Sequence, residues 1–294
     1  MAFINTPLRY PGGKSSLSVF LTDLLEINGL TGGVYVEPYA GGAGAAVNLL
    51  LEGQVERIVI NDRDRAIYQF WVSMLEEPGQ FARLVEETPV TVPEWRRQKN
   101  VFLNPERFSD LAVGFATFFL NRCNHSGILK ANPIGGIHQT GRYPIWARFN
   151  KKDLLARIER IVSLRDRIEV YNLDAADLLN DVVSEIAVTH DVLVYLDPPY
   201  FEKGSQLYLD YYTATDHAVL AETMRCLDTV AWAMTYDDVA DIRALYPWAN
   251  ITNFNLNYFA HKPKKGCELL IAPQRLHLPE RVVVHYGQGR ATAS

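Results

Sequence analysis

Cysteine is scarce in this chain. Its 294 residues include three cysteines, Cys123, Cys226 and Cys267, which are widely spaced and form no Cys-x-x-Cys pair. This argues against a disulfide framework and against a zinc site, and the seven histidines show no metal-ligand spacing either. We therefore expect reduced cysteines that pack in the interior and no bound metal.

Long hydrophobic runs are also missing. The longest apolar stretch, residues 112–120, is far too short to span a bilayer. Residues 1–11 contain no basic segment followed by an apolar one, so nothing there is typical of a secretory signal. The sequence favours a cytoplasmic protein.

Hydrophobic residues make up 48% of the chain, enough for the core of one α/β domain and one smaller lobe. The net charge of −5 is unevenly distributed: residues 91–167 contain 14 Lys and Arg against 6 Asp and Glu, and the rest is acidic. A local positive face attracts a polyanion such as nucleic acid. The alternative is a set of solvated helix faces.

Seven short β-type runs recur along the chain, at 34–36, 57–60, 168–171, 192–196, 230–236, 251–258 and 267–272. A helix-length stretch separates the first two, which is typical of a parallel sheet with crossover helices. The last two flank a polar turn and predict a terminal hairpin, and Asp216-His217 is predicted to cap a helical run through residues 224–227. The predicted fold is a doubly wound α/β fold with a mixed, mostly parallel sheet.

Between residues 65 and 160 the pattern becomes mainly helical, with runs at 66–75, 78–87, 93–102 and 105–122. It is broken by a Gly-, Pro- and Asn-rich stretch, 121–143, that cannot form a regular element. The positive charge lies in the same region. We therefore predict a catalytic domain, 1–64 and 161–294, interrupted by an inserted helical domain, 65–160.

The most informative motif is Asp197-Pro198-Pro199-Tyr200, directly behind the apolar run 192–196. A double proline ends a strand, so we expect the motif at the carboxyl edge of the sheet, where ligands bind in open α/β folds. A carboxylate, a prolyl carbonyl and an aromatic ring suit a planar base with an exocyclic amino group. The two oxygens accept its hydrogens, and the ring stacks on the base.

Two glycine pairs also precede predicted helices. Gly41 and Gly42 follow the first strand, where glycine lets the backbone approach a ligand, and alone they are also typical of a tight turn. Asp62 follows the second strand, where an acid in nucleoside-binding folds accepts from ribose hydroxyls. The pair Gly12-Gly13, with Lys14 after it, is either an anion clamp or a plain N-terminal turn.

Together these segments resemble a known family, the class-alpha adenine-N6-specific DNA methyltransferases (the DNA adenine methylase family). The resemblance covers roughly residues 5 to 272 and rests on Tyr10-Pro11-Gly12-Gly13-Lys14, Glu37-Pro38-Tyr39-Ala40-Gly41-Gly42, Asn61-Asp62, Asn121-Arg122, Asp197-Pro198-Pro199-Tyr200 and Glu268-Leu269-Leu270-Ile271, in the family's order. It implies a seven-stranded S-adenosylmethionine-dependent methyltransferase fold with an inserted, mainly helical target-recognition domain.

The resemblance also implies roles for matching residues. The cofactor, S-adenosylmethionine, which leaves as S-adenosylhomocysteine, would be bound by Tyr10, Pro11, Gly12, Gly13, Lys14, Glu37, Tyr39, Gly41, Gly42, Asp62, Asp174 and Asp197. Asp62 would hold the ribose hydroxyls, and Asp174, or less favourably Asp177, would reach the adenine. Catalysis would rest on Asp197, Pro198, Pro199 and Tyr200.

Double-stranded DNA is the implied partner. It would be bound by Arg122, Asn124, Ser126, Lys130, Arg142 and Tyr143. We expect Arg142 to read bases and Arg122 to contact phosphates. The target adenine would be flipped out and stacked on Tyr200. Three further tyrosines are either pocket walls or a structural aromatic cluster: Tyr208, Tyr211 and Tyr212. A bacterial, archaeal or phage origin and a restriction endonuclease or defence-system partner fit this family.

Two other hypotheses remain open. A methylase with the same cofactor can act on cytosine, an RNA base or protein glutamine, although Asp rather than Asn at position 197 and the basic insertion favour adenine in DNA. A degenerate, non-catalytic DNA-binding module is the second. The intact residues Lys14, Asp62 and Asp197 argue against it.

Overall fold

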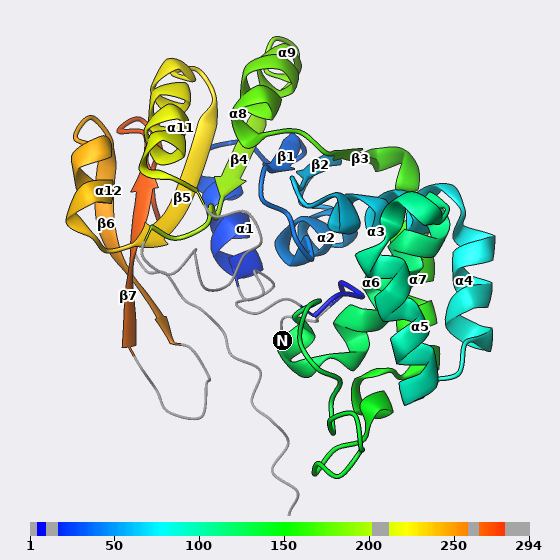
Figure 1. The fold of residues 1–294 in the computed structure, drawn as a ribbon. Coiled ribbons are helices and arrows are strands. Elements are labelled where there is room, and N and C mark those ends of the chain that lie inside the picture. Colours follow the sequence, from blue (N-terminus) through cyan, green and yellow to red (C-terminus); the bar gives the residue numbers. More distant parts are fainter. Residues whose placement is uncertain (1–4, 10–16, 202–211, 258–264, 280–294) are drawn as a thin grey trace, which may run out of the picture.

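A computed structural model describes residues 5–9, 17–201, 212–257 and 265–279 of the chain. A seven-stranded sheet crosses the molecule in the order β3-β2-β1-β4-β5-β7-β6 (Figure 1). The strands are β1 (Val34–Glu37), β2 (Arg57–Asn61), β3 (Ile168–Tyr171), β4 (Val192–Leu196), β5 (Ala231–Asp237), β6 (Asn250–Asn257) and β7 (Lys265–Ala272). The five adjacent strands β3, β2, β1, β4 and β5 are parallel, and β7 is antiparallel to its two neighbours, β5 and β6. The predicted mixed, mostly parallel sheet is confirmed.

Both faces of the sheet are buried, and side chains alternate between them. On β1, Tyr35 joins the core beneath α1 (Ser18–Ile27) and α2 (Gly44–Leu51), whereas Val34 and Val36 join the core on the other side. Burial on both faces explains why these strands are short continuous apolar runs. It also explains why the sequence predicted them closely.

The helices of the opposite face follow β3, β4 and β5 along the chain. They are α8 (Ala175–Asp177), a π-helical stretch (Leu178–Val183), α9 (Ser184–Ile186), α11 (Ala214–Cys226) and α12 (Ala240–Leu245). Their apolar residues pack with the strands in one core. With α1 and α2 on the first face, the sheet is doubly wound, as predicted. No helix of the described part is long and apolar enough to cross a membrane.

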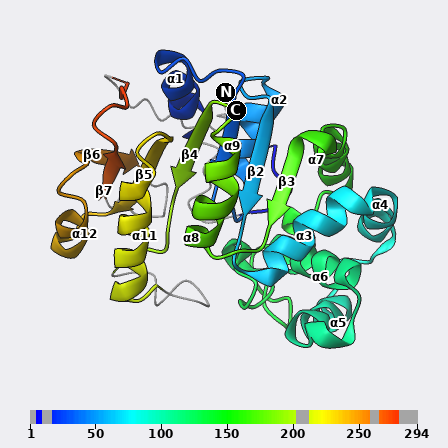
Figure 2. The same ribbon diagram turned by 90° about the horizontal axis from the view of Figure 1, so that it is seen from above.

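The mainly helical region lies at the β3 end of the sheet (Figures 1 and 2). It contains α3 (Arg65–Glu76), α4 (Pro78–Glu87), α5 (Val92–Leu103), α6 (Asp110–Cys123) and α7 (Lys151–Val162). Phe115, Phe118 and Phe119 of α6 are buried in a cluster that continues into the sheet core. We keep the term insertion for residues 65–160, and the domain boundaries themselves remain a prediction.

Two helix starts differ from the prediction. The helix expected at 105–122 begins at Asp110, because the Ser109 side chain accepts a hydrogen bond from the Ala112 N–H, and residues Pro105–Arg107 form a separate 3-10 turn. The helix expected to be capped by Asp216 and His217 is capped by Thr213 instead. Asp216 completes a capping box by accepting from the Thr213 N–H.

Candidate active site

Carboxylates gather where four neighbouring strands end. Glu37 is the last residue of β1, Asp62 and Asp197 directly follow β2 and β4, and Asp174 comes shortly after β3. Because these strands are parallel and adjacent, their carboxyl ends form one edge, where open α/β sheets bind ligands. Carboxylates accept hydrogen bonds from hydroxyl and amino groups. The edge therefore suits a ligand rich in such donors.

The glycine turn after β1 is held in place by Asp62. The Gly41 N–H donates to Asp62 Oδ2 at 2.8 Å, and the other carboxylate oxygen accepts from the Asp64 N–H at 2.9 Å. On its other side Gly41 accepts from the Trp71 indole N–H at 3.0 Å. The φ of Gly41 is 50°, a left-handed conformation that favours glycine. This fixed turn opens α2, and the adjacent Gly42 is buried with it.

Glu37 faces the interior beneath this turn. It is fully buried, and its Oε1 accepts from the Tyr35 hydroxyl at 3.0 Å and from the Ala46 N–H of α2 at 3.2 Å. Burial and the Glu37 charge hold the pKa of Tyr35 well above its usual range, so Tyr35 stays a donor. Glu37 thus ties β1 to the helix that follows the glycine turn.

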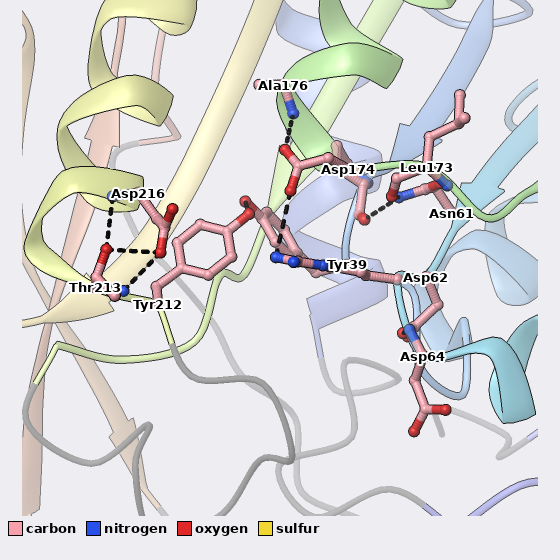
Figure 3. Close-up of polar contacts among 12 residues, drawn as sticks. Tyr39, Asn61, Asp62, Asp64, Leu173, Asp174, Ala176, Tyr212, Thr213 and Asp216 are labelled. Carbon is pink, nitrogen blue, oxygen red and sulfur yellow. Dashed lines mark hydrogen bonds and ion pairs between the residues drawn. The ribbon is translucent and has the colours of Figure 1, made fainter.

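Asn61 is a positioning residue to which the sequence analysis assigned no role. Its amide donates to the carbonyls of Pro38 and Leu173, at 2.9 and 3.1 Å, and accepts from the Leu173 N–H at 2.8 Å. These bonds join the loops after β1, β2 and β3 (Figure 3). A polar residue at the end of an otherwise apolar strand was the signal in the sequence.

Asp174 lies in the same group of loops. Its carboxylate caps α8 by accepting from the Ala176 N–H at 3.0 Å and forms an ion pair with Arg63 at 3.5 Å. Tyr39 lies beside it and shares a 2.7 Å hydrogen bond with the Tyr212 hydroxyl (Figure 3). Asp177, the alternative to Asp174, is exposed on α8.

Asp197 is oriented by a buried hydroxyl relay. The Thr235 hydroxyl on β5 donates to Asp197 Oδ1 at 3.2 Å and shares a 2.9 Å hydrogen bond with the Tyr195 hydroxyl. Burial and the Asp197 charge raise the pKa of Tyr195, so its hydroxyl keeps its proton. Sequence reasoning missed Thr235, although a threonine inside an apolar strand beside the motif was a visible signal.

The rest of the motif lies at the same edge. Pro198 is buried, whereas Pro199 and Tyr200 are half-buried, so the Tyr200 ring is partly accessible. The next residue, Phe201, donates its backbone N–H to the buried Asp237 carboxylate at the end of β5, at 3.0 Å. Asp237 therefore fixes the chain where it leaves the motif.

An aromatic cluster covers this side of the edge. His217 of α11 is buried, shares a 2.7 Å hydrogen bond with the Tyr236 hydroxyl and packs against the rings of Phe201 and Tyr212. Tyr212 is thus part of a structural cluster, one of the two alternatives considered for it. Tyr208 and Tyr211 lie outside the described residues, as do Tyr10, Pro11, Gly12, Gly13 and Lys14.

The loop between α6 and α7 presents part of the predicted DNA surface. Ser126, Lys130, Arg142 and Tyr143 are exposed, and the Arg142 guanidinium lies 5.3 Å from the centroid of the Tyr143 ring. In Figure 1 this loop, coloured green, projects below the helices of the insertion. Cationic and aromatic side chains on a projecting loop suit a nucleic acid.

Arg122 and Asn124 do not share this exposure. The Arg122 guanidinium is buried and donates to the Arg148 carbonyl at 2.8 Å, and burial lowers its pKa to about 9. Asn124 is fully buried, accepts from the Trp95 indole and donates to the carbonyls of the loop. Both residues use their polar atoms inside the protein.

The doubly wound sheet with acids at its carboxyl edge is that of an α/β protein, and the match to a sequence family gives its class, the S-adenosylmethionine-dependent methyltransferases. Within that class, the chain belongs to the D12 class N6 adenine-specific DNA methyltransferase family, whose model matches residues 10–258. It is therefore an adenine-specific DNA methyltransferase, which methylates the N6 amino group of adenine in DNA.

Solved structures of one other methyltransferase are similar to this chain. The rRNA methyltransferase aviRa from Streptomyces viridochromogenes, at 1.5 Å, is 12% identical, with a TM-score of 0.42 over 91% of this chain and 89% of that chain. A second structure of it, at 2.4 Å, is 14% identical, with a TM-score of 0.40 over 90% and 85%. No curated protein matches the chain significantly.

Proposed function

We propose that this enzyme methylates one adenine within a specific sequence of double-stranded DNA, after the base is flipped out of the helix. The observation that supports this best is the position of Asp197 and Pro198 at the end of β4, next to β1 and its glycine turn. A base held at the end of β4 would be adjacent to a cofactor held at the end of β1.

The edge fits S-adenosylmethionine by the chemistry of its acceptors. Asp62 would accept from the ribose hydroxyls, because it directly follows β2 at the ligand edge and lies beside the glycine turn that it holds. Asp174 and Tyr39 would contact the adenine, and Tyr10 and Lys14 the methionine end. When bound, the cofactor supplies an electrophilic methyl group on a sulfonium.

Asp197 and the Pro198 carbonyl would activate the acceptor. The amino nitrogen of adenine is a poor nucleophile, because its lone pair is delocalised into the ring. Two acceptors for its hydrogens favour a tetrahedral nitrogen whose lone pair is available for in-line attack. The relay from Tyr195 through Thr235 holds the Asp197 carboxylate in one orientation. Tyr200, half-buried beside it, would stack on the base.

The exposed loop of the insertion would bind the duplex. Lys130, Arg142 and Tyr143 are available there, and the amino group to be methylated takes part in base pairing, so the base has to leave the helix. We assign DNA contacts to these residues and to Ser126. Arg122 and Asn124, because of their burial, would act on DNA only through the loop they support.

Site-specific methylation fits a role in restriction or defence, in which the methyl group would protect a sequence from a cognate endonuclease. Such an enzyme would work in the cytoplasm, where the DNA of a bacterium, archaeon or phage is found. This part of the proposal rests on the DNA substrate alone.

The test is to incubate the protein with S-adenosylmethionine and genomic DNA that lacks methylated bases, and then to map N6-methyladenine along the sequence. We expect modified adenine in one short sequence context and in duplex DNA. Modification of every adenine, or of single strands only, would refute the proposal of a specific duplex site.

A further inference from the structure

Residues 5–9 form a strap between the insertion and the glycine turn, directly before Tyr10 in the sequence. The strap is far in sequence from its partners but buried among them: Asn5, Thr6 and Leu8 are all nearly inaccessible. Its contacts come from two sides, and each side belongs to a different part of the enzyme.

Asn121 of α6 forms hydrogen bonds with the strap on the insertion side. Its Oδ1 accepts from the Arg9 N–H at 2.7 Å, and its Nδ2 donates to the Arg9 carbonyl at 2.8 Å and to the Gly127 carbonyl at 3.0 Å. One amide thus pairs with both backbone groups of one residue, as a strand partner does. Because Asn121 is buried on a packed helix, it fixes the position and direction of the chain at Arg9.

The other strap carbonyls are bound by arginines of the insertion. Arg122 donates to the Pro7 carbonyl at 3.4 Å, and Arg157 of α7 donates to the Thr6 carbonyl at 3.2 Å. The loop also closes tightly on the strap, because a Cβ at Gly127 would lie 2.3 Å from the Arg9 carbonyl oxygen. Arg122, which the sequence suggested for DNA, is therefore used on the strap.

On its other side the strap contacts the glycine turn and α2. The Thr6 hydroxyl donates to the Gly42 carbonyl at 2.5 Å, and the Asn5 amide donates to Asn48 Oδ1 at 2.9 Å. The strap therefore joins the DNA-binding insertion to the turn that lines the cofactor site.

We propose that Asn121 is a positioning residue for the cofactor site, not a DNA contact: it fixes the strap, and the strap fixes the glycine turn through the bond from Thr6 to the Gly42 carbonyl. This inference rests on the proposed function, in which the cofactor is held at the end of β1 beside this turn. It predicts that a residue in the DNA-binding insertion controls the affinity for the cofactor.

Asn124 provides a matched control. It lies one helical turn after Asn121, is also buried, and also makes three side-chain hydrogen bonds, but they go to Trp95 and to the carbonyls of Ile128 and Leu129. Its side chain holds the loop of the insertion, whereas that of Asn121 also holds the strap. The two substitutions should therefore separate cofactor binding from DNA binding.

The experiment measures S-adenosylmethionine binding by calorimetry and duplex binding without cofactor, using the full chain. Asn121→Leu should raise the dissociation constant for S-adenosylmethionine by about tenfold or more, with a raised KM for the cofactor and a nearly unchanged kcat at saturation. Asn124→Leu should leave cofactor affinity unchanged and weaken duplex binding. The inference would be overturned if Asn121→Leu weakened duplex binding and left cofactor affinity unchanged, while Asn124→Leu weakened cofactor binding.

Thr6→Val tests the other end of the strap with a side chain of the same shape, so the inference stays testable if Asn121→Leu does not fold. It too should weaken cofactor binding and spare duplex binding. Lys14→Ala separates a failure of this inference from a failure of the proposed function. If Lys14→Ala weakens cofactor binding and neither strap variant does, only this inference fails. If the unmodified protein binds no S-adenosylmethionine, the proposed function itself fails.

Discussion

Thr235 positions Asp197, the proposed catalytic residue. Its hydroxyl donates to Asp197 Oδ1 and is itself held by Tyr195. A carboxylate that rotates freely would accept the adenine amino hydrogens in fewer of its orientations, so the loss of this hydroxyl should act on the chemical step rather than on binding.

We predict that Thr235→Val lowers kcat by about tenfold to a hundredfold, while the dissociation constant for S-adenosylmethionine is unchanged. Thr235→Ser, which keeps the hydroxyl, should restore most of the rate. Thr117→Val is the control, because Thr117 is equally buried but donates within α6 to the Val113 carbonyl. Single-turnover kinetics would measure the step, and an equal loss in the control would point to stability instead.

Asp62 is the residue on which cofactor affinity should depend most. It holds the Gly41 turn and would accept from the ribose hydroxyls, so Asp62→Ala removes both interactions. We expect a dissociation constant for S-adenosylmethionine raised by roughly a hundredfold, since a lost bond to a charged acceptor is worth about 1.5–3 kcal/mol. The neighbouring Asp64→Ala removes the carboxylate that caps α3 by accepting from the Ala66 N–H, and it should leave this constant unchanged. An unchanged constant in Asp62→Ala would exclude the ribose role.

Among the secondary-structure elements, α11 depends on a buried histidine. Burial lowers the pKa of His217 below its ordinary value of 6.5, although the charges of Asp237 and Asp216 oppose this shift. As the pH falls through 6.5, the unfolded chain takes up a proton that the folded protein resists. Folding stability should therefore decrease as the pH is lowered from about 7 to about 5.

Urea denaturation at both pH values would measure this change. The loss of folding stability at the lower pH should be smaller in His217→Gln, whose amide can still form a hydrogen bond with the Tyr236 hydroxyl but cannot titrate. A His190→Gln variant is the control, because His190 is exposed and follows α9. If all three proteins lose stability equally, the dependence does not arise from His217.

The sequence predicted the elements of the sheet well and the side-chain directions poorly. Strands buried on both faces are continuous apolar runs, so β1, β2 and β4 and the acids at their ends were visible. The direction of Arg122 was not, because a charge count does not show that the α6 terminus faces residues 5–9. Thr235 and Asn61 were missed for the same reason: their partners lie on other strands or loops.

Across the whole molecule, the arrangement separates an acidic ligand edge from a basic insertion. Arg142 is exposed on the projecting loop, whereas Arg122 is committed to carbonyls inside the protein. If Arg142 reads a guanine edge, Arg142→Ala should cost about 1–3 kcal/mol on the cognate duplex only. If it contacts a phosphate, all duplexes should weaken alike and the salt slope should fall by about one.

Fluorescence anisotropy on cognate and scrambled duplexes, across a salt series, separates these outcomes. We expect the outcome of a guanine contact, a loss of affinity on the cognate duplex only. Arg225→Ala, at an exposed position on α11, is the control and should change neither affinity nor slope, because α11 lies on the side of the molecule away from the insertion (Figure 2). If Arg142→Ala behaves like that control on every duplex, the projecting loop is not the DNA surface.

The central claim is that Asp197 activates the amino nitrogen of an adenine in DNA. The most direct measurement is mass spectrometry of the nucleosides from duplex DNA treated with S-adenosylmethionine and either the unmodified protein or Asp197→Ala. We predict N6-methyladenine with the unmodified protein, and a rate lower by about a hundredfold or more with the variant, whose cofactor affinity is largely retained. Methylated cytosine as the product, or near-normal turnover by Asp197→Ala, would contradict the claim.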